Sequence, residues 1–287
     1  MQDLLNRALD QHAEQPAAAA ATLAEALSLT AKAGDEELLA LLRTAEHVLL
    51  GHLADGAALR ELLAALPERA ALRPALQRIA AALSLTAGES PLWQDLAPAE
   101  RVRAHYNAAL ARTRRGDLAG ARRLLDAAQA QAGEAGNDAA AQKALAALAN
   151  NVAGDLRYYH RGGDADYDTL MLDAAALALA AWTHAGGWLE RERAEWQLAL
   201  CAAAAGRAEQ ALAHARQCLR ICEEQGADAF ERFFAHEAIA RAAHAGRDPA
   251  LARQAREQMA ALLARLPEAD RVMAVQSLAE LDARLAR

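Results

Sequence analysis

The chain has 287 residues and a net charge of −7, and 54% of its residues are hydrophobic while only 4% are aromatic. Much of the hydrophobic content is alanine, which has the highest helix propensity and lets neighbouring helices approach closely. This composition predicts an all-α fold. The acidic balance argues against nucleic acid as a partner, because proteins bind a phosphate backbone through lysine and arginine.

The sequence carries no sign of export or of membrane insertion. Residues 1–7 lack a basic start that leads into an apolar core, and no run approaches the roughly 20 apolar residues of a membrane span. We therefore expect a cytoplasmic protein with no membrane partner. The three cysteines, Cys201, Cys218 and Cys222, are expected to be reduced thiols.

The amino-terminal third is predicted to form short helices separated by glycine and proline, at about 2–14, 16–33, 35–53, 56–66 and 68–86. Ser90-Pro91 and Ala97-Pro98 then interrupt the helical pattern, because the residue before a proline avoids helical geometry. The predicted organisation is an N-terminal helical segment, a linker and a carboxyl-terminal array, with bounds 1–90, 91–98 and 99–287.

Four glycine-containing turns follow the linker, at Gly116, Gly162, Gly206 and Gly246, and each lies between two alanine-rich runs. Their spacing is typical of stacked helical hairpins, in which each hairpin buries its apolar faces against its neighbours. The expected helix pairs are 99–115 with 118–132, 138–160 with 167–184, 188–205 with 208–225 and 230–245 with 249–266, followed by a capping helix at 268–286.

The segment Arg115-Gly116-Asp117-Leu118-Ala119-Gly120-Ala121 resembles the turn of a tetratricopeptide repeat followed by the small residue of its second helix. Gly206 and Ala211 repeat this offset, whereas Gly246 is followed at the same offset by Leu251. The periods also exceed the roughly 34 residues of that family. The resemblance covers residues 100–266 approximately, and it implies a right-handed solenoid of antiparallel helical hairpins whose first helices line a concave groove.

Each expected first helix carries one long polar residue nine to eleven positions before its turn glycine. We call these four residues the polar stripe: Asn107, Asn151, Gln197 and Glu237. The tetratricopeptide resemblance implies that they face the groove. The further groove candidates near the stripe are Arg103, Tyr106, Asn150, Arg157, Tyr158, Arg193, Trp196, Phe233 and His236.

The polar stripe has two interpretations that the sequence leaves open. Amides can donate to and accept from a peptide backbone, and arginine can hold a carboxylate in a bidentate pair, so the stripe suits a bound peptide. Alternatively, the same side chains bond to the neighbouring hairpin and satisfy buried polar groups between helices.

The sequence carries few residue patterns that are typical of metal binding or catalysis. His214, Cys218 and Cys222 are spaced four residues apart on one expected helix, with Cys201 on the helix before it. Imidazole and thiolate are zinc ligands, but this spacing also traces the face that packs on the first helix, so we expect core packing and no metal. The sequence contains no nucleotide-binding loop and no nucleophile elbow, so we expect neither a cofactor nor enzymatic activity.

These observations predict a noncatalytic adaptor that binds a peptide or a helix of a partner protein in the groove of its helical repeats. The alternative is a small-ligand-sensing regulatory module of a signalling or transcription system. In that alternative, the ligand would be enclosed by Tyr106, Asn151, Arg157, Tyr158 and Trp196. A homodimer is compatible with either function.

Overall fold

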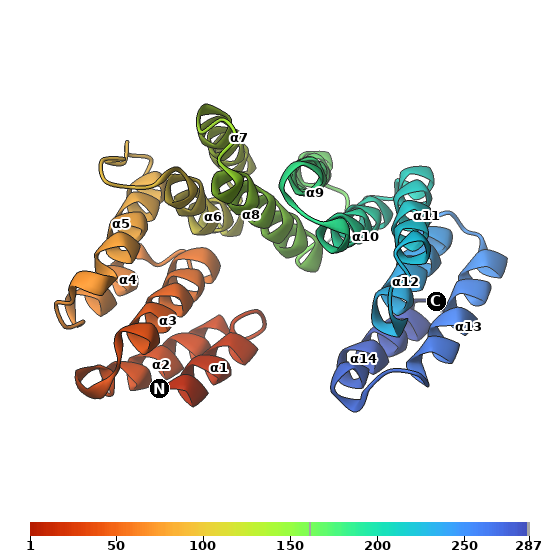
Figure 1. The fold of residues 1–287 in the computed structure, drawn as a ribbon, viewed down its shortest axis with the longest axis horizontal. Coiled ribbons are helices and arrows are strands. Elements are labelled where there is room, and N and C mark those ends of the chain that lie inside the picture. Colours follow the sequence, from red (N-terminus) through yellow and green to blue (C-terminus); the bar gives the residue numbers. More distant parts are fainter. Residues whose placement is uncertain (161, 286–287) are drawn as a thin grey trace. The chain divides into compact units, whose positions relative to one another are not determined.

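The computed structural model describes residues 1–160 and 162–285, which form fourteen α-helices and no strand (Figure 1). The predicted all-α fold is therefore confirmed. The chain divides into two compact units, Met1–Leu148 and Ala149–Arg287. We call them the first and the second unit and describe each by itself.

The first unit has a core built largely from leucine side chains of its first five helices and the turns between them. Its α-helices are α1 (Gln2–Gln11), α2 (Pro16–Leu27), α3 (Asp35–Ala45), α4 (Gly56–Ala64), α5 (Arg73–Ala87), α6 (Pro98–Arg114) and α7 (Leu118–Glu134), and α8 begins at Ala139. Three further helical segments are η1 (Thr30–Lys32), η2 (Glu46–His52) and η3 (Ala70–Leu72).

Three segments of the first unit differ from the predicted helices. The helix predicted at 16–33 ends at Leu27 as α2, and the short 3-10 helix η1 follows it. Helix α3 continues directly into η2, which is a π-helix, so the predicted helix at 35–53 changes its hydrogen-bonding pattern halfway. Helix α5 begins at Arg73 and not at residue 68, because Pro74 is tolerated only in the first turn of a helix. Helix α6 packs against η2, against α5 and against α7.

Residues 91–98, where the sequence places the linker, connect α5 and α6 inside the first unit. The indole ring of Trp93 stacks on the imidazole ring of His105 with 5.6 Å between centroids, and Leu96 is buried. The division between the two units falls within α8, between Leu148 and Ala149. The prolines thus separate two helices that remain packed on each other.

The second unit contains the carboxyl-terminal half of the chain. Its helices are α8 (Ala139–Tyr158) from Ala149 onward, α9 (Ala165–Ala185), α10 (Trp188–Ala204), α11 (Ala208–Glu224), α12 (Ala229–Ala245), α13 (Pro249–Leu263) and α14 (Glu268–Leu285). Helix α10 packs against α9, α11 and α12, and α12 packs against α11, α13 and α14. The predicted helices of this half are therefore present, and the chain is compatible with a helical repeat.

Helix starts and turns follow the polar and glycine residues that the sequence places between helices. The side chains of Asp117, Asp164 and Asp228 accept hydrogen bonds from backbone amides at the starts of α7, α9 and α12. Gly206 has a φ of 70°, in the left-handed region that favours glycine. At the last predicted turn this conformation belongs to Arg247, with a φ of 56°.

In the described parts of the chain, each helix is either too short or too polar to cross a lipid bilayer.

Candidate functional site

The structure buries three of the four residues of the polar stripe. Asn107, Gln197 and Glu237 are only 4%, 4% and 3% exposed, whereas Asn151 is exposed. Asn107 belongs to the first unit and the other three belong to the second. For the three buried side chains, the second interpretation of the stripe therefore expects contacts with neighbouring helices.

Glu237 illustrates such contacts within the second unit. Its carboxylate accepts hydrogen bonds from the indole nitrogen of Trp196 at 3.2 Å, from Nε of Arg241 at 2.8 Å and from the hydroxyl of Ser277 at 2.8 Å. These residues lie on α10, α12 and α14, so one carboxylate connects three helices. Gln197 lies against Gly154, where a side chain would come within 3.0 Å of its Nε2 atom.

The second unit contains a cavity of about 380 Å³ among α8, α10, α12 and α14. We call it the aromatic cavity. It brings together three predicted groove residues, Asn150, Arg193 and Trp196. The ring of Phe234 meets those of Trp196 and Phe230 edge to face, with centroid distances of 6.1 and 4.9 Å. The complete lining is Asn150, Glu192, Arg193, Trp196, Phe230, Glu231, Phe234 and Met273.

Two carboxyl groups line the aromatic cavity, and their surroundings differ. Glu231 forms an ion pair with Arg193, with Nε of the arginine 3.4 Å from Oε2. Glu192 is buried, and its Oε1 atom accepts a hydrogen bond from the thiol of Cys218 at 2.8 Å. Its Oε2 atom has no hydrogen-bond partner among the described residues. Glu192 therefore keeps one buried carboxyl oxygen without a hydrogen-bond partner behind the lining of the cavity.

Burial raises the pKa of Glu192 to about 7, and the nearby carboxylate of Glu231 adds to this rise. The thiol hydrogen bond from Cys218 opposes it. Glu192 is thus partly protonated at neutral pH. With Glu231 paired to Arg193, the aromatic cavity carries little net charge despite its two carboxyl groups.

A second cavity of about 340 Å³ lies between α8, α10, α12 and α14 and contains the predicted residues Arg157 and Tyr158. We call it the cationic cavity, because three arginines and two histidines line it. The guanidinium of Arg157 lies over the ring of Trp196, 5.6 Å from its centroid, and its Nε atom has no hydrogen-bond partner among the described residues. The charged and titratable lining residues are Arg157, His160, Arg241, His244 and Arg284.

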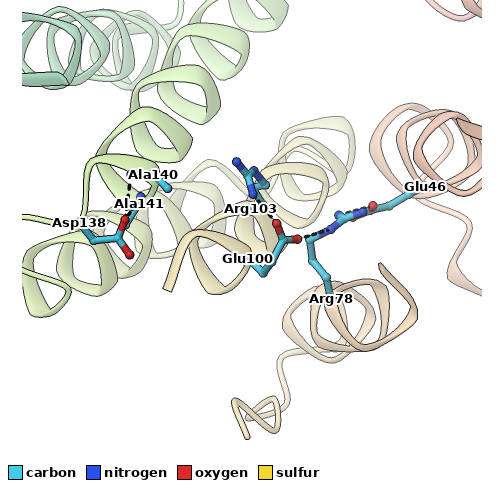
Figure 2. A network of polar contacts seen from close by, with 7 residues as sticks. All are labelled: Glu46, Arg78, Glu100, Arg103, Asp138, Ala140 and Ala141. Atoms are coloured by element: carbon cyan, nitrogen blue, oxygen red, sulfur yellow. Dashed lines mark hydrogen bonds and ion pairs between the residues drawn. The ribbon is translucent and has the colours of Figure 1, made fainter. Parts of the chain in front are cut away.

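Four predicted groove residues lie outside both cavities, in addition to the four residues of the polar stripe. In the first unit, exposed Arg103 forms an ion pair with Glu100 (Figure 2), and the ring of Tyr106 stacks on His47 at 5.7 Å. In the second unit, Phe233 is fully buried, and burial lowers the pKa of half-buried His236. The predicted groove residues therefore lie in three kinds of place: in the core, on the surface and in the two cavities.

The predicted packing of the cysteines is confirmed, although their polar partner is a residue that the sequence did not suggest. Cys218 and Cys222 are fully buried, with their sulfur atoms 2.8 and 3.5 Å from Oε1 of Glu192. His214 lies apart from them and contacts the carboxylate of Glu195 at 2.6 Å. The pKa of Cys218 is raised by its contact with Cys222 and by burial, so the Cys218 thiol stays protonated in the core.

Sequence reasoning missed five lining residues of the aromatic cavity: Glu192, Phe230, Glu231, Phe234 and Met273. The run Glu190-Arg191-Glu192-Arg193 is typical of a solvated helix face, so the sequence indicates an exposed Glu192, whereas the structure buries it. A usable signal was present in its i, i+4 spacing to Trp196, because residues four apart share a helix face.

Replacing Glu192 by glutamine is expected to remove a pH dependence of stability. The folded-state pKa is raised from 4.5 to about 7, so the folded chain binds more protons than the unfolded chain between these values. The stability of the wild type should therefore fall as pH rises from 4.5 to 7, by roughly 3 kcal/mol for this group, and stay level above. Urea unfolding at several pH values measures this slope.

Glu209→Gln provides the matched control for the Glu192 experiment, because Glu209 is an exposed carboxylate on neighbouring α11. The control accounts for the change in net charge. A Glu192→Gln variant whose stability falls with pH as steeply as that of the wild type would contradict the assignment.

Comparison with known proteins reveals no family: no family model matches the chain, and no curated protein matches it.

Proposed function

We propose that the chain is a noncatalytic binding module whose second unit holds a peptide or a helix of a partner protein. The bound segment places a bulky apolar side chain in the aromatic cavity and an acidic group at the cationic cavity. The observation that carries this proposal is the position of Trp196, which lines the first cavity while its indole ring packs on Arg157 of the second.

The lining of the aromatic cavity supports an apolar anchor. Three aromatic rings and a methionine offer polarisable surface, and such groups are enriched where interfaces derive most of their binding energy. The cavity lies within the roughly 300–1,000 Å³ range of ligand sites.

The cationic cavity supports an acidic group on the same segment. Guanidinium groups bind carboxylates through paired N–H donors, and a site of low water content strengthens that attraction. Arg157, Arg241 and Arg284 supply such donors around the cationic cavity. In a chain with a net charge of −7, this local concentration of cations also provides selectivity for acidic partners.

The proposal is tested with a peptide library selected against the full chain, followed by fluorescence anisotropy of the enriched peptides. We expect the enriched sequences to share a bulky apolar residue close to Asp or Glu. Met273→Glu should weaken their binding at least about tenfold, because it places a charge at the wall of the aromatic cavity. Arg284→Glu should weaken selectively those peptides that carry the acidic residue.

Val272→Glu is the matched control, since Val272 neighbours Met273 on α14, is 76% exposed against 59%, and does not line the cavity. Arg220→Glu on α11 controls for the loss of an exposed positive charge. Equal loss of affinity in Met273→Glu and Val272→Glu would contradict the proposal, as would enriched peptides without a shared anchor.

The alternative function, sensing of a small ligand, is favoured by the same cavity volume. A ligand that raises the melting temperature of the chain, and loses this effect in Met273→Glu or Arg284→Glu, would support it. A panel of aromatic carboxylates and phosphates is the appropriate probe, because it matches the aromatic and cationic linings.

A further inference from the structure

The first unit contains three histidines whose rings lie together, His12, His47 and His52, which we call the histidine cluster. The distances between ring centroids are 5.1 Å for His12 and His47, 4.9 Å for His12 and His52, and 4.6 Å for His47 and His52. Each ring offers one nitrogen, and these three nitrogens lie within 4.8 Å of one another. His12 directly follows α1, and the other two belong to η2.

The π-helical geometry of η2 places His47 and His52 on one face. In an α-helix, residues five positions apart differ by about 140° around the axis and point to different sides. In a π-helix the hydrogen bonds run between residues five apart, as from the amide of Leu53 to the carbonyl of Val48 at 3.0 Å. Such π-helical turns are rare and occur frequently at functional sites.

The nitrogen atoms have the spacing of ligands that share one metal ion. Two nitrogens bound tetrahedrally at the usual zinc–nitrogen distance lie about 3.3 Å apart. The Nε2 atoms of His47 and His52 are separated by 3.2 Å. Three imidazoles would leave a fourth coordination position open for water or for another ligand.

Contacts behind the rings orient two of the histidines for binding through Nε2. The Nδ1 atom of His47 lies 3.2 Å from Oδ1 of Asn107, which can only accept, so this nitrogen carries the proton and Nε2 keeps its lone pair. The Nδ1 atom of His12 is likewise bonded to the backbone carbonyl of Leu9. Such outer contacts fix the tautomer of metal-binding histidines.

Gly51 allows the approach of Asn107 to η2. A Cβ atom at position 51 would lie 2.8 Å from Oδ1 of Asn107, closer than real contacts permit. Glycine, the buried amide and the π-helical turn therefore depend on one another. This dependence gives a buried stripe residue, Asn107, a specific task in the first unit.

We propose that the histidine cluster binds one divalent transition-metal ion, Zn²⁺ foremost, through the Nε2 atoms of His12, His47 and His52. Imidazole is a good ligand for zinc, copper and nickel, whereas magnesium and calcium prefer oxygen. Ligation uses the neutral imidazole, whose unprotonated ring nitrogen carries the lone pair.

Arg114 opposes metal binding and offers a discriminating test. Its Nη2 atom lies 3.3 Å from Nδ1 of His52, and a guanidinium only donates, so Nδ1 accepts and the ring proton resides on Nε2. Ligation through Nε2 requires the other tautomer of His52, in which the ring proton has moved from Nε2 to Nδ1 by exchange with water. On Nδ1 this proton would face the N–H donor of Arg114. Arg114→Gln supplies an acceptor oxygen and should therefore strengthen metal binding severalfold.

The experiment is a Zn²⁺ titration of the full chain in competition with a chromophoric chelator, together with Co²⁺ absorption spectra. We expect one Zn²⁺ per chain. His47→Gln and His52→Gln should each weaken binding by more than about 100-fold, and Asn107→Leu by about 10- to 100-fold. His184→Gln is the matched control, because His184 is an exposed histidine on α9 of the second unit. It should bind as the wild type does.

Several outcomes would overturn the proposal. One is the lack of stoichiometric binding, and another is equal affinity in His52→Gln and His184→Gln. A third is a sulfur-to-cobalt charge-transfer band, which would place the metal at Cys218 and Cys222 instead. Circular dichroism confirms folding of each variant. If the η2 variants do not fold, His12→Gln replaces them, because His12 is partly exposed and follows the end of α1.

Discussion

Replacement of Arg78 by leucine is expected to destabilise the first unit by about 3–5 kcal/mol. Arg78 forms an ion pair with Glu46, and its Nε atom lies 3.1 Å from Oε2 of Glu100 (Figure 2). Glu46 is only 1% exposed, and its Oε1 atom has no hydrogen-bond partner among the described residues. Without Arg78 the buried carboxylate of Glu46 loses its ion-pair partner. Urea unfolding followed by circular dichroism measures the loss.

Arg69→Leu serves as the control for this experiment, because Arg69 pairs with Asp35 at 3.3 Å on the surface of the same unit. Exposed ion pairs contribute about 0–1 kcal/mol, so this variant should differ little from the wild type. Adding Glu46→Leu to Arg78→Leu should recover part of the stability, since it removes the unpaired buried charge. If Arg78→Leu alone costs less than about 1 kcal/mol, or Glu46→Leu worsens it, this account of the network is wrong.

The helices were predictable from the sequence because local residues determine where they begin and end. Aspartates such as Asp117 and Asp228 cap helices through their own side chains, and glycines such as Gly206 adopt conformations that other residues avoid. These effects act over a few residues. The π-helical turn η2 was not predictable in this way, because it continues α3 without a break and packs on α6, a helix distant in the sequence.

The candidate site was predicted only in part, for a related reason. Counting from turn glycines identifies equivalent positions, and it reached Asn107 and Glu237 correctly as polar residues within helices. It cannot decide whether a position faces solvent or a neighbour, because alanine makes every face of such helices similarly apolar. One residue of register also matters: Asn150 lines the aromatic cavity, whereas Asn151 is exposed. Residues one apart differ by about 100° around an α-helix.

Replacing the buried carboxylate of Glu237 is expected to cause a second large loss of stability, in the second unit. Glu237→Leu is expected to cost about 3–5 kcal/mol, because it leaves Arg241 without its buried ion-pair partner and removes the acceptor of Trp196 and Ser277. Glu237→Gln should cost less, since its amide oxygen still accepts although the charge is lost. Urea unfolding of both variants measures the difference.

Glu280→Gln is the appropriate control, because Glu280 also contacts Arg241, at 3.5 Å, but its side chain is 53% exposed. It should cost no more than about 1 kcal/mol. Glu237→Leu should also affect binding, since Trp196 lines the aromatic cavity and α8, α12 and α14 supply the rest of its lining. Peptide affinity should therefore fall in Glu237→Leu and remain near wild type in Glu280→Gln. A stable Glu237→Leu variant with unchanged peptide affinity would mean that the carboxylate does not hold these helices in place.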